Sequence, residues 1–142
     1  MADKTRILVV VADDDADDQE LIKKGLAGFR LEVEMNSVYN GLQLLDYLLK
    51  RDAYKNIPGS PDLILLDLNM PLMDGFSVLK EIRNHDSLKK IPLYVISTSH
   101  SVRDREKALS LGATGFYPKG WGPDDIRDIM EAICQQSFPQ AT

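Results

Sequence analysis

Cysteine is almost missing from this sequence: Cys134 is the only one, so no disulfide can form within the chain. Because disulfides persist in oxidising compartments, a protein without them is most simply placed in the cytoplasm. Long apolar runs are missing as well. The N-terminal run, residues 7–12, is too short for a signal peptide and ends in acids. No run reaches the roughly 20 residues of a membrane-spanning helix, so we expect a cytoplasmic protein with no membrane partner.

An excess of positive charge is also missing. The 17 Lys and Arg residues are outnumbered by 22 Asp and Glu, which leaves a formal net charge of -5. Because non-specific nucleic-acid binding needs a basic surface, we expect no DNA partner. The 142 residues are 44% hydrophobic, which is enough for one folded domain. We expect a core over residues 5–134 and a frayed tail over residues 135–142.

Short β-rich runs alternate with segments of helical periodicity five times along the chain. The expected strands are Ile7–Val11, 31–37, Leu63–Leu66, 91–97 and 114–118. The expected helices are Asp17–Phe29, one opening at Asn40 and Gly41, Gly75–Asn84, Val102–Leu111 and Pro123–Cys134. In the second of these helices, Leu42, Leu45, Leu48 and Leu49 form the expected apolar stripe.

Five strand–helix units predict a parallel sheet with helices on both faces, which is an α/β fold. Residues 31–37 alternate apolar and polar side chains, so we expect this second strand at an edge of the sheet. An edge second strand fits the flavodoxin-like strand order 2-1-3-4-5.

Polar residues collect where the expected strands end. The first strand ends in Asp13, Asp14 and Asp15, and the third in Asp67. The fourth ends in Ser97 and Thr98, and Lys119 follows the fifth. Because ligands bind at the carboxyl ends of parallel strands, these side chains are candidates for one site.

The chemistry of this set favours a metal and a phosphoryl group. Carboxylates brought close together repel unless they are protonated or share a cation. Oxygen ligands without a Cys or His cluster suit Mg²⁺, which also accepts phosphate oxygens. A lysine and a hydroxyl would bind the other phosphoryl oxygens, and a carboxylate can itself be the nucleophile. The set therefore predicts Mg²⁺-assisted phosphoryl transfer to a carboxylate.

Each residue also has a simpler explanation. Residues 13–15 could cap a helix whose dipole favours acids, and Asp67 could be a turn residue before Pro71. Ser97 could merely end a strand, and Lys119 could be a surface lysine. Their joint placement on one rim of the sheet favours a shared site.

Four motifs together resemble the receiver domain of two-component response regulators. In chain order they are "ILVVVADDD", "LILLDLNMPLMDG", "VIST" and "GFYPKG", and the resemblance covers about Thr5–Cys134. It implies that Asp67 is the phosphoacceptor, with Asp14 as a direct Mg²⁺ ligand and Asp13 acting through water. The backbone carbonyl of Asn69 completes the protein's share of the metal shell, and Lys119 binds a phosphoryl oxygen.

The resemblance also implies residues that switch conformation and residues that set the rate at which the phosphoryl group is lost. Ser97 supplies the hydroxyl that moves toward the phosphoryl group, and Phe116 occupies the position of the switch aromatic. Asn69 and Ser99 match two positions that tune loss of the phosphoryl group. The family usually has proline directly after the lysine, often with a cis peptide. Here Gly120 follows Lys119, so a cis bond is not expected.

The implied partner is a sensor histidine kinase or a histidine phosphotransfer protein. "KRDAYKNIPGSPD" and "DDQELIKKGL" resemble stand-alone receivers that are paired with bacterial phytochromes. No DNA-binding or enzyme domain is expected after Cys134, so the output should be binding. A homodimer through the fourth helix, fifth strand and fifth helix is one such output.

Three other classes stay open at this point. A small Mg²⁺-dependent phosphatase of the haloacid dehalogenase type could use Asp67 as its nucleophile, although "DLN" lacks the second acid of its D-x-D motif. A degenerate receiver would bind partners without being phosphorylated. A flavodoxin would bind a flavin, but an acid-lined rim repels the flavin phosphate.

Overall fold

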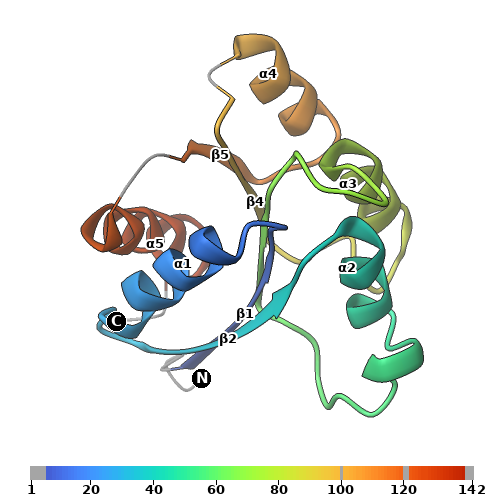
Figure 1. The fold of residues 1–142 in the computed structure, drawn as a ribbon, viewed down its shortest axis with the longest axis horizontal. Coiled ribbons are helices and arrows are strands. Elements are labelled where there is room, and N and C mark those ends of the chain that lie inside the picture. Colours follow the sequence, from blue (N-terminus) through green and yellow to red (C-terminus); the bar gives the residue numbers. More distant parts are fainter. Residues whose placement is uncertain (1–5, 100, 120–121, 140–142) are drawn as a thin grey trace.

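The computed structural model describes residues 6–99, 101–119 and 122–139. Its centre is a five-stranded parallel sheet in the order β2-β1-β3-β4-β5 (Figure 1). The strands are β1 (Arg6–Ala12), β2 (Glu32–Val38), β3 (Leu63–Leu66), β4 (Leu93–Ser97) and β5 (Gly115–Pro118). The helices are α1 (Ala16–Ala27), α2 (Gly41–Leu48), α3 (Gly75–Asn84), α4 (Val102–Ser110) and α5 (Pro123–Ser137), with a short 3-10 helix η1 (Asp52–Tyr54). The predicted α/β class and strand order are confirmed.

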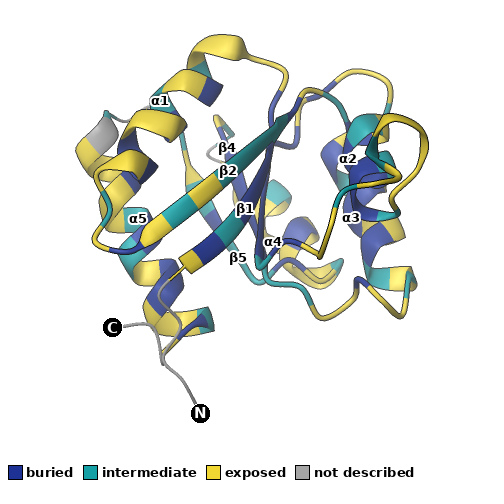
Figure 2. Ribbon diagram, turned by 90° about the horizontal axis from the view of Figure 1, so that it is seen from below, coloured by how far each residue is buried: buried dark blue, intermediate teal, exposed yellow. Residues whose placement is uncertain are grey.

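Alternate side chains of β1 pack into two separate hydrophobic cores, one on each face of the sheet. Val9 and Val11 pack in the core beneath α1 and α5, and Val10 and Ala12 pack in the core beneath α2 and α3. Both pairs are almost fully buried, because helices cover the sheet on both sides (Figures 1 and 2). A strand covered on both faces needs an unbroken apolar run, which is what residues 7–12 provide.

The strand β2 lies at one edge of the sheet and pairs only with β1, in a parallel register that sets Val9 opposite Met35. Its residues are mostly exposed or half-buried (Figure 2), as the alternating pattern predicted. At the other edge lies β5, which pairs only with β4.

The predicted apolar stripe of α2 is wrong at one position. Leu42 is 47% exposed, and the buried face instead includes Leu44 and Tyr47 together with Leu45 and Leu48. Gly41 explains the rotation, since a Cβ there would lie 2.2 Å from the carbonyl oxygen of Met73. The Gly41 side of the helix therefore lies against the β3–α3 loop, and Leu42, about 100° around the helix, faces outward.

The predicted start of a frayed tail at residue 135 is wrong. Helix α5 continues to Ser137, three residues past the expected end, and Phe138 is only 7% exposed. The hydroxyls of Tyr94 and Ser137 share a 2.7 Å hydrogen bond. Burial of the Phe138 ring in the core beneath α1 and α5 therefore holds residues 135–138 in place. Among the described residues, no helix has the length and apolarity needed to cross a membrane.

Candidate functional site

Backbone hydrogen bonds carry the sheet one residue past the ends of β1 and β3. The Asp13 N–H donates to the carbonyl of Val38 at 3.1 Å, and the Asp67 N–H donates to the carbonyl of Ala12 at 2.9 Å. These two bonds hold Asp13 and Asp67 side by side on neighbouring strands. Both residues are buried, at 1% and 5% exposed, so they lie beneath the surface at this edge of the sheet.

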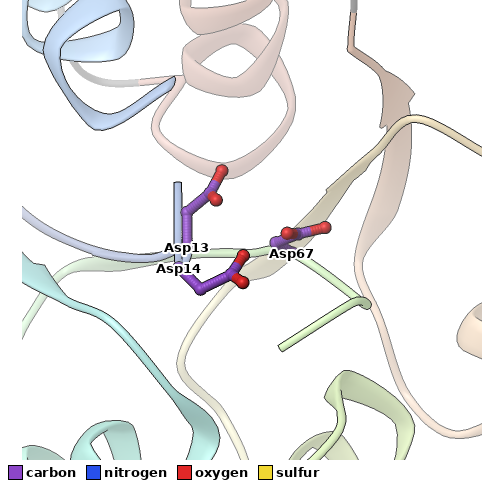
Figure 3. A group of neighbouring side chains, drawn as sticks. All are labelled: Asp13, Asp14 and Asp67. Carbon is purple, nitrogen blue, oxygen red and sulfur yellow. The ribbon is translucent and has the colours of Figure 1, made fainter. Parts of the chain in front are cut away.

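Asp13, Asp14 and Asp67 form a candidate metal site (Figure 3). One carboxylate oxygen from each lies within 4.8 Å of the others, and Asp14 is the exposed member. Three carboxylates this close need a shared positive charge, and an all-oxygen set suits a hard divalent cation. The prediction that these residues come together is confirmed.

Lys119 lies in the same cluster. Its Nζ is 2.6 Å from Asp13 Oδ2 and 3.3 Å from Asp67 Oδ2, and its side chain is only 7% exposed. The Lys119 N–H donates to the carbonyl of Ser97 at 2.7 Å, which places the lysine beside the end of β4. A buried ammonium beside a carboxylate is not a surface lysine, so the simpler explanation for Lys119 is excluded.

Burial and charge pull the pKa values of this cluster in opposite directions. Burial raises the pKa of Asp13 to about 6, against the hydrogen bonds from Lys119 and Asp15 that lower it. Burial also raises the pKa of Asp67, and the charge of Lys119 opposes it. For Lys119, burial lowers the pKa, but hydrogen bonds to Asp13 and Asp18 outweigh it and raise the value. The lysine therefore stays charged at neutral pH. Burial instead disfavours the charged form of the two carboxylates, whose pKa values are raised.

The three acids that follow β1 have two different roles. Asp15 caps α1, since its Oδ1 accepts from the N–H groups of Asp17 at 2.8 Å and Asp18 at 3.2 Å. Asp13 and Asp14 instead belong to the candidate metal site with Asp67. The helix-cap explanation thus holds for Asp15 alone.

Ser97 ends β4 and is completely buried, whereas Thr98 is exposed. The Ser97 Oγ accepts a hydrogen bond from the N–H of Ser99 at 3.1 Å. The Ser99 hydroxyl donates in turn to Asp104 Oδ2 at 2.7 Å, in the first turn of α4. The serine beside the cluster is therefore joined to α4 by two consecutive hydrogen bonds.

Asn69 and Phe116 differ in their surroundings. Asn69 is exposed, and its N–H donates to Asp67 Oδ1 at 3.3 Å. Phe116 in β5 is 9% exposed and packs into the core beneath α2 and α3. It also lines an open groove beside the start of α4, together with Ser99, Ser101, Val102, Arg105 and Pro118.

Gly75 fixes the turn from β3 into α3. Its N–H donates to the carbonyl of Leu68 at 2.9 Å, and a Cβ there would lie 2.5 Å from the Leu68 Cα. The chain can turn this tightly after Asp67 only with glycine at this position. The peptide bond between Lys119 and Gly120, for which no cis form was expected, lies outside the described residues.

Two side chains of the site were missed by sequence reasoning. Asp18 Oδ2 lies 3.0 Å from Lys119 Nζ, and the buried Gln19 amide donates to the carbonyls of Val11, Asp13 and Val38. Both lie in the first turn of α1. Their role depends on the rotation of α1 about its axis relative to the strand ends, which the sequence does not specify. The run "DDQ" alone looks like the exposed first turn of any helix.

The comparisons with known proteins agree with this geometry. Residues 9–131 match the response regulator receiver domain, and the chain belongs to that family. It is therefore a receiver domain of two-component signalling. Family membership decides against the haloacid dehalogenase and flavodoxin alternatives.

The chain is similar to response regulator Rcp1 of Synechocystis, with 31% identity over 89% of this chain and 85% of that protein. The Mn²⁺-bound structure of Rcp1 gives a TM-score of 0.81, with 31% identity over 96% of both chains. The structure of the phosphorylated cyanobacterial phytochrome response regulator RcpA gives 0.84, with 32% identity, 96% coverage of this chain and 97% of that one. By contrast, the chain spans only 53% of response regulator MprA of Mycobacterium bovis, another relative.

Proposed function

We propose that Asp67 accepts a phosphoryl group from a phosphohistidine of a partner protein and that this phosphorylation controls binding to other proteins. The observation that carries the proposal is the position of Asp67 in the candidate metal site and beside the Lys119 ammonium, at 3.3 Å. A carboxylate nucleophile with positive charge on both sides can approach an anionic phosphoryl group.

The donor set fits Mg²⁺. Asp14 and Asp67 would bind it directly, Asp13 through water and Asn69 through its backbone carbonyl, which gives an all-oxygen shell. The bound ion would supply positive charge for the phosphoryl oxygens and relieve the repulsion among the three carboxylates. The relative Rcp1 has a Mn²⁺-bound form, which supports a divalent ion in this chain as well.

The proposed reaction moves the phosphoryl group from a histidine nitrogen to Asp67. A carboxylate oxygen of Asp67 attacks phosphorus as the bond from phosphorus to the histidine nitrogen breaks, which leaves an acyl phosphate and a free imidazole. The Lys119 ammonium binds one phosphoryl oxygen and so stabilises the charge that moves toward Asp67. Water later cleaves the acyl phosphate and restores the carboxylate, a step that Asn69 and Ser99 would tune.

The contacts of Ser97 support a switch of this kind. If its hydroxyl moves toward the phosphoryl group, the hydrogen bond that Ser97 accepts from Ser99 would be strained or lost, and α4 lies at the end of that chain of bonds. Phe116 lines the groove beside α4 and would fill the space that Ser97 leaves. A pre-existing equilibrium between two arrangements of this face would shift on phosphorylation.

The proposed donor is a sensor histidine kinase or histidine phosphotransfer protein in the cytoplasm. The relative RcpA is a phytochrome response regulator, which supports a light-sensing kinase of that type as the donor. The proposed output surface is the face of α4, β5 and α5, through which a target or a second copy would bind.

Beryllofluoride, a stable mimic of a phosphoryl group, tests the proposal directly. With Mg²⁺ it should shift the amide NMR signals of Ser97, Phe116 and α4 in the wild type and leave Asp67→Asn unchanged. No shift in the wild type, or the same shift in Asp67→Asn, would show a receiver that only binds partners. Multiple turnovers of a small phosphomonoester would instead show a phosphatase.

A further inference from the structure

The Lys119 ammonium contacts one more carboxylate than the proposed chemistry requires. Its Nζ lies 2.6 Å from Asp13, 3.0 Å from Asp18 and 3.3 Å from Asp67. A lysine ammonium has three N–H donors, so three carboxylates can occupy all of them. A phosphoryl oxygen that approaches while Asp67 is still a free carboxylate can bind Lys119 only if one of these contacts is released.

Asp18 differs from the other two carboxylates in its surroundings. Its side chain is 35% exposed, whereas those of Asp13 and Asp67 are 2% and 6% exposed. Asp18 also lies outside the cluster of three acids that could hold a metal. Among the described partners of Lys119, it is therefore the one that neither the ion nor the phosphoryl transfer uses.

The backbone of Asp18 is held firmly despite this exposure. Its N–H donates to the Asp15 cap. The next residue, Gln19, is 4% exposed and donates at 3.1 Å to the carbonyls of Val11 and Asp13, which lie on either side of the last residue of β1. The first turn of α1 is thus pinned to the strand ends that carry the cluster. Asp18 is placed against Lys119 by the fold and not by free motion of a surface side chain.

We propose that Asp18 is a positioning residue for Lys119: it holds the ammonium in the unphosphorylated protein and releases it to the phosphoryl group. The proposal rests on the proposed function. Releasing Asp18 leaves a carboxylate that water can solvate, whereas releasing Asp13 would leave a buried unpaired charge, which costs far more.

Asp18 therefore competes with the incoming phosphoryl group for Lys119. Its negative charge also reduces the positive potential that an approaching anion meets. Removal of that charge should tighten the binding of a phosphoryl mimic.

The test compares Asp18→Asn with Asp18→Glu and Asp17→Asn by titrating beryllofluoride at saturating Mg²⁺. Asp17→Asn is the matched control because it removes the same charge from the same turn, at an exposed residue. Asp18→Asn should lower the half-saturating concentration by roughly threefold to tenfold, about 1 kcal/mol in binding free energy. Asp18→Glu should stay within about twofold of the wild type because it keeps the negative charge beside Lys119. Asp17→Asn should do the same, since exposed charges farther away are screened.

The NMR signal of the Lys119 ammonium separates this role from a merely structural one. It should shift in Asp18→Asn before beryllofluoride is added and coincide with the wild-type signal afterwards. Asp18→Ser gives the same comparison if Asp18→Asn does not fold. Equal half-saturating concentrations for Asp18→Asn and Asp17→Asn would overturn the proposal for Asp18 alone. Unchanged beryllofluoride binding in Asp67→Asn would instead overturn the proposed function.

Discussion

Leu72 carries backbone strain next to the phosphoryl site. Its φ is 68°, in the left-handed region, and the Met73 N–H donates to the carbonyl of Pro71 at 2.8 Å across it. Such a three-residue turn is rare for a side chain with a Cβ. Leu72 gains little from burial, since it is 77% exposed. Strain in an exposed residue beside a site indicates that the loop shape matters there more than stability does.

Replacing Leu72 with Gly should relieve this strain. We expect Leu72→Gly to raise the free energy of unfolding by roughly 0.5–1 kcal/mol, since relief of about 1–2 kcal/mol is partly offset by the greater flexibility of glycine when unfolded. Urea unfolding measures the change. Leu42→Gly is the control: it places glycine inside α2 and should lower stability by about 1 kcal/mol. A loss of stability in Leu72→Gly would show that the leucine side chain makes a contact that outweighs the strain.

Residue by residue, the sequence predicted the strand-end groups and missed a helix-borne one. Asp67 and Lys119 could be placed because each directly follows a strand, and parallel strands end at one edge. Asp18 could not, because its contact with Lys119 depends on the rotation of α1, which the buried Gln19 fixes through three backbone carbonyls.

Among the elements, α4 is the helix least fixed by burial. Ala108 is its only fully buried residue among those described. Polar contacts take over: Ser101 caps the helix, Asp104 accepts from Ser99, and Lys107 Nζ lies 4.3 Å from the centre of the Phe76 ring. A helix held in this way can shift without disturbing the core.

Asp104→Ala should loosen α4 selectively, because it removes the acceptor of the Ser99 hydroxyl. Loss of one hydrogen bond worth about 1 kcal/mol should speed amide hydrogen exchange over Val102–Ser110 roughly fivefold. Exchange in β1 and β3 should stay unchanged. Glu106→Ala, an exposed acid on the same helix, is the matched control. Equal exchange rates in the two variants would show that the bond from Ser99 does not restrain α4.

Element types were predictable from the sequence, but two details depended on contacts between elements. The face that α2 buries depends on Gly41 lying against Met73. The end of α5 depends on Phe138 reaching the core and on the hydrogen bond between Tyr94 and Ser137. Periodicity within one segment contains no information about either contact.

For the whole molecule, the strand order brings the chemistry together. The neighbours β1, β3, β4 and β5 end on one rim, so Asp13, Asp67, Ser97 and Lys119 meet although they are more than a hundred residues apart at the extremes. The edge strand β2 contributes no charged group there. The predicted strand order therefore implied the site before any distance was known.

The measurement that tests the central claim most directly is intact-protein mass spectrometry after treatment with acetyl phosphate, with and without Mg²⁺. We expect one phosphoryl group per chain, present only with Mg²⁺, lost on mild alkaline treatment as an acyl phosphate is, and mapped to the peptide that contains Asp67. Asp67→Ala should remain unmodified, and Asp74→Ala, which changes an acid of the same loop outside the cluster, should be modified like the wild type. A wild-type chain that stays unmodified, or a label that persists in Asp67→Ala, would contradict the account.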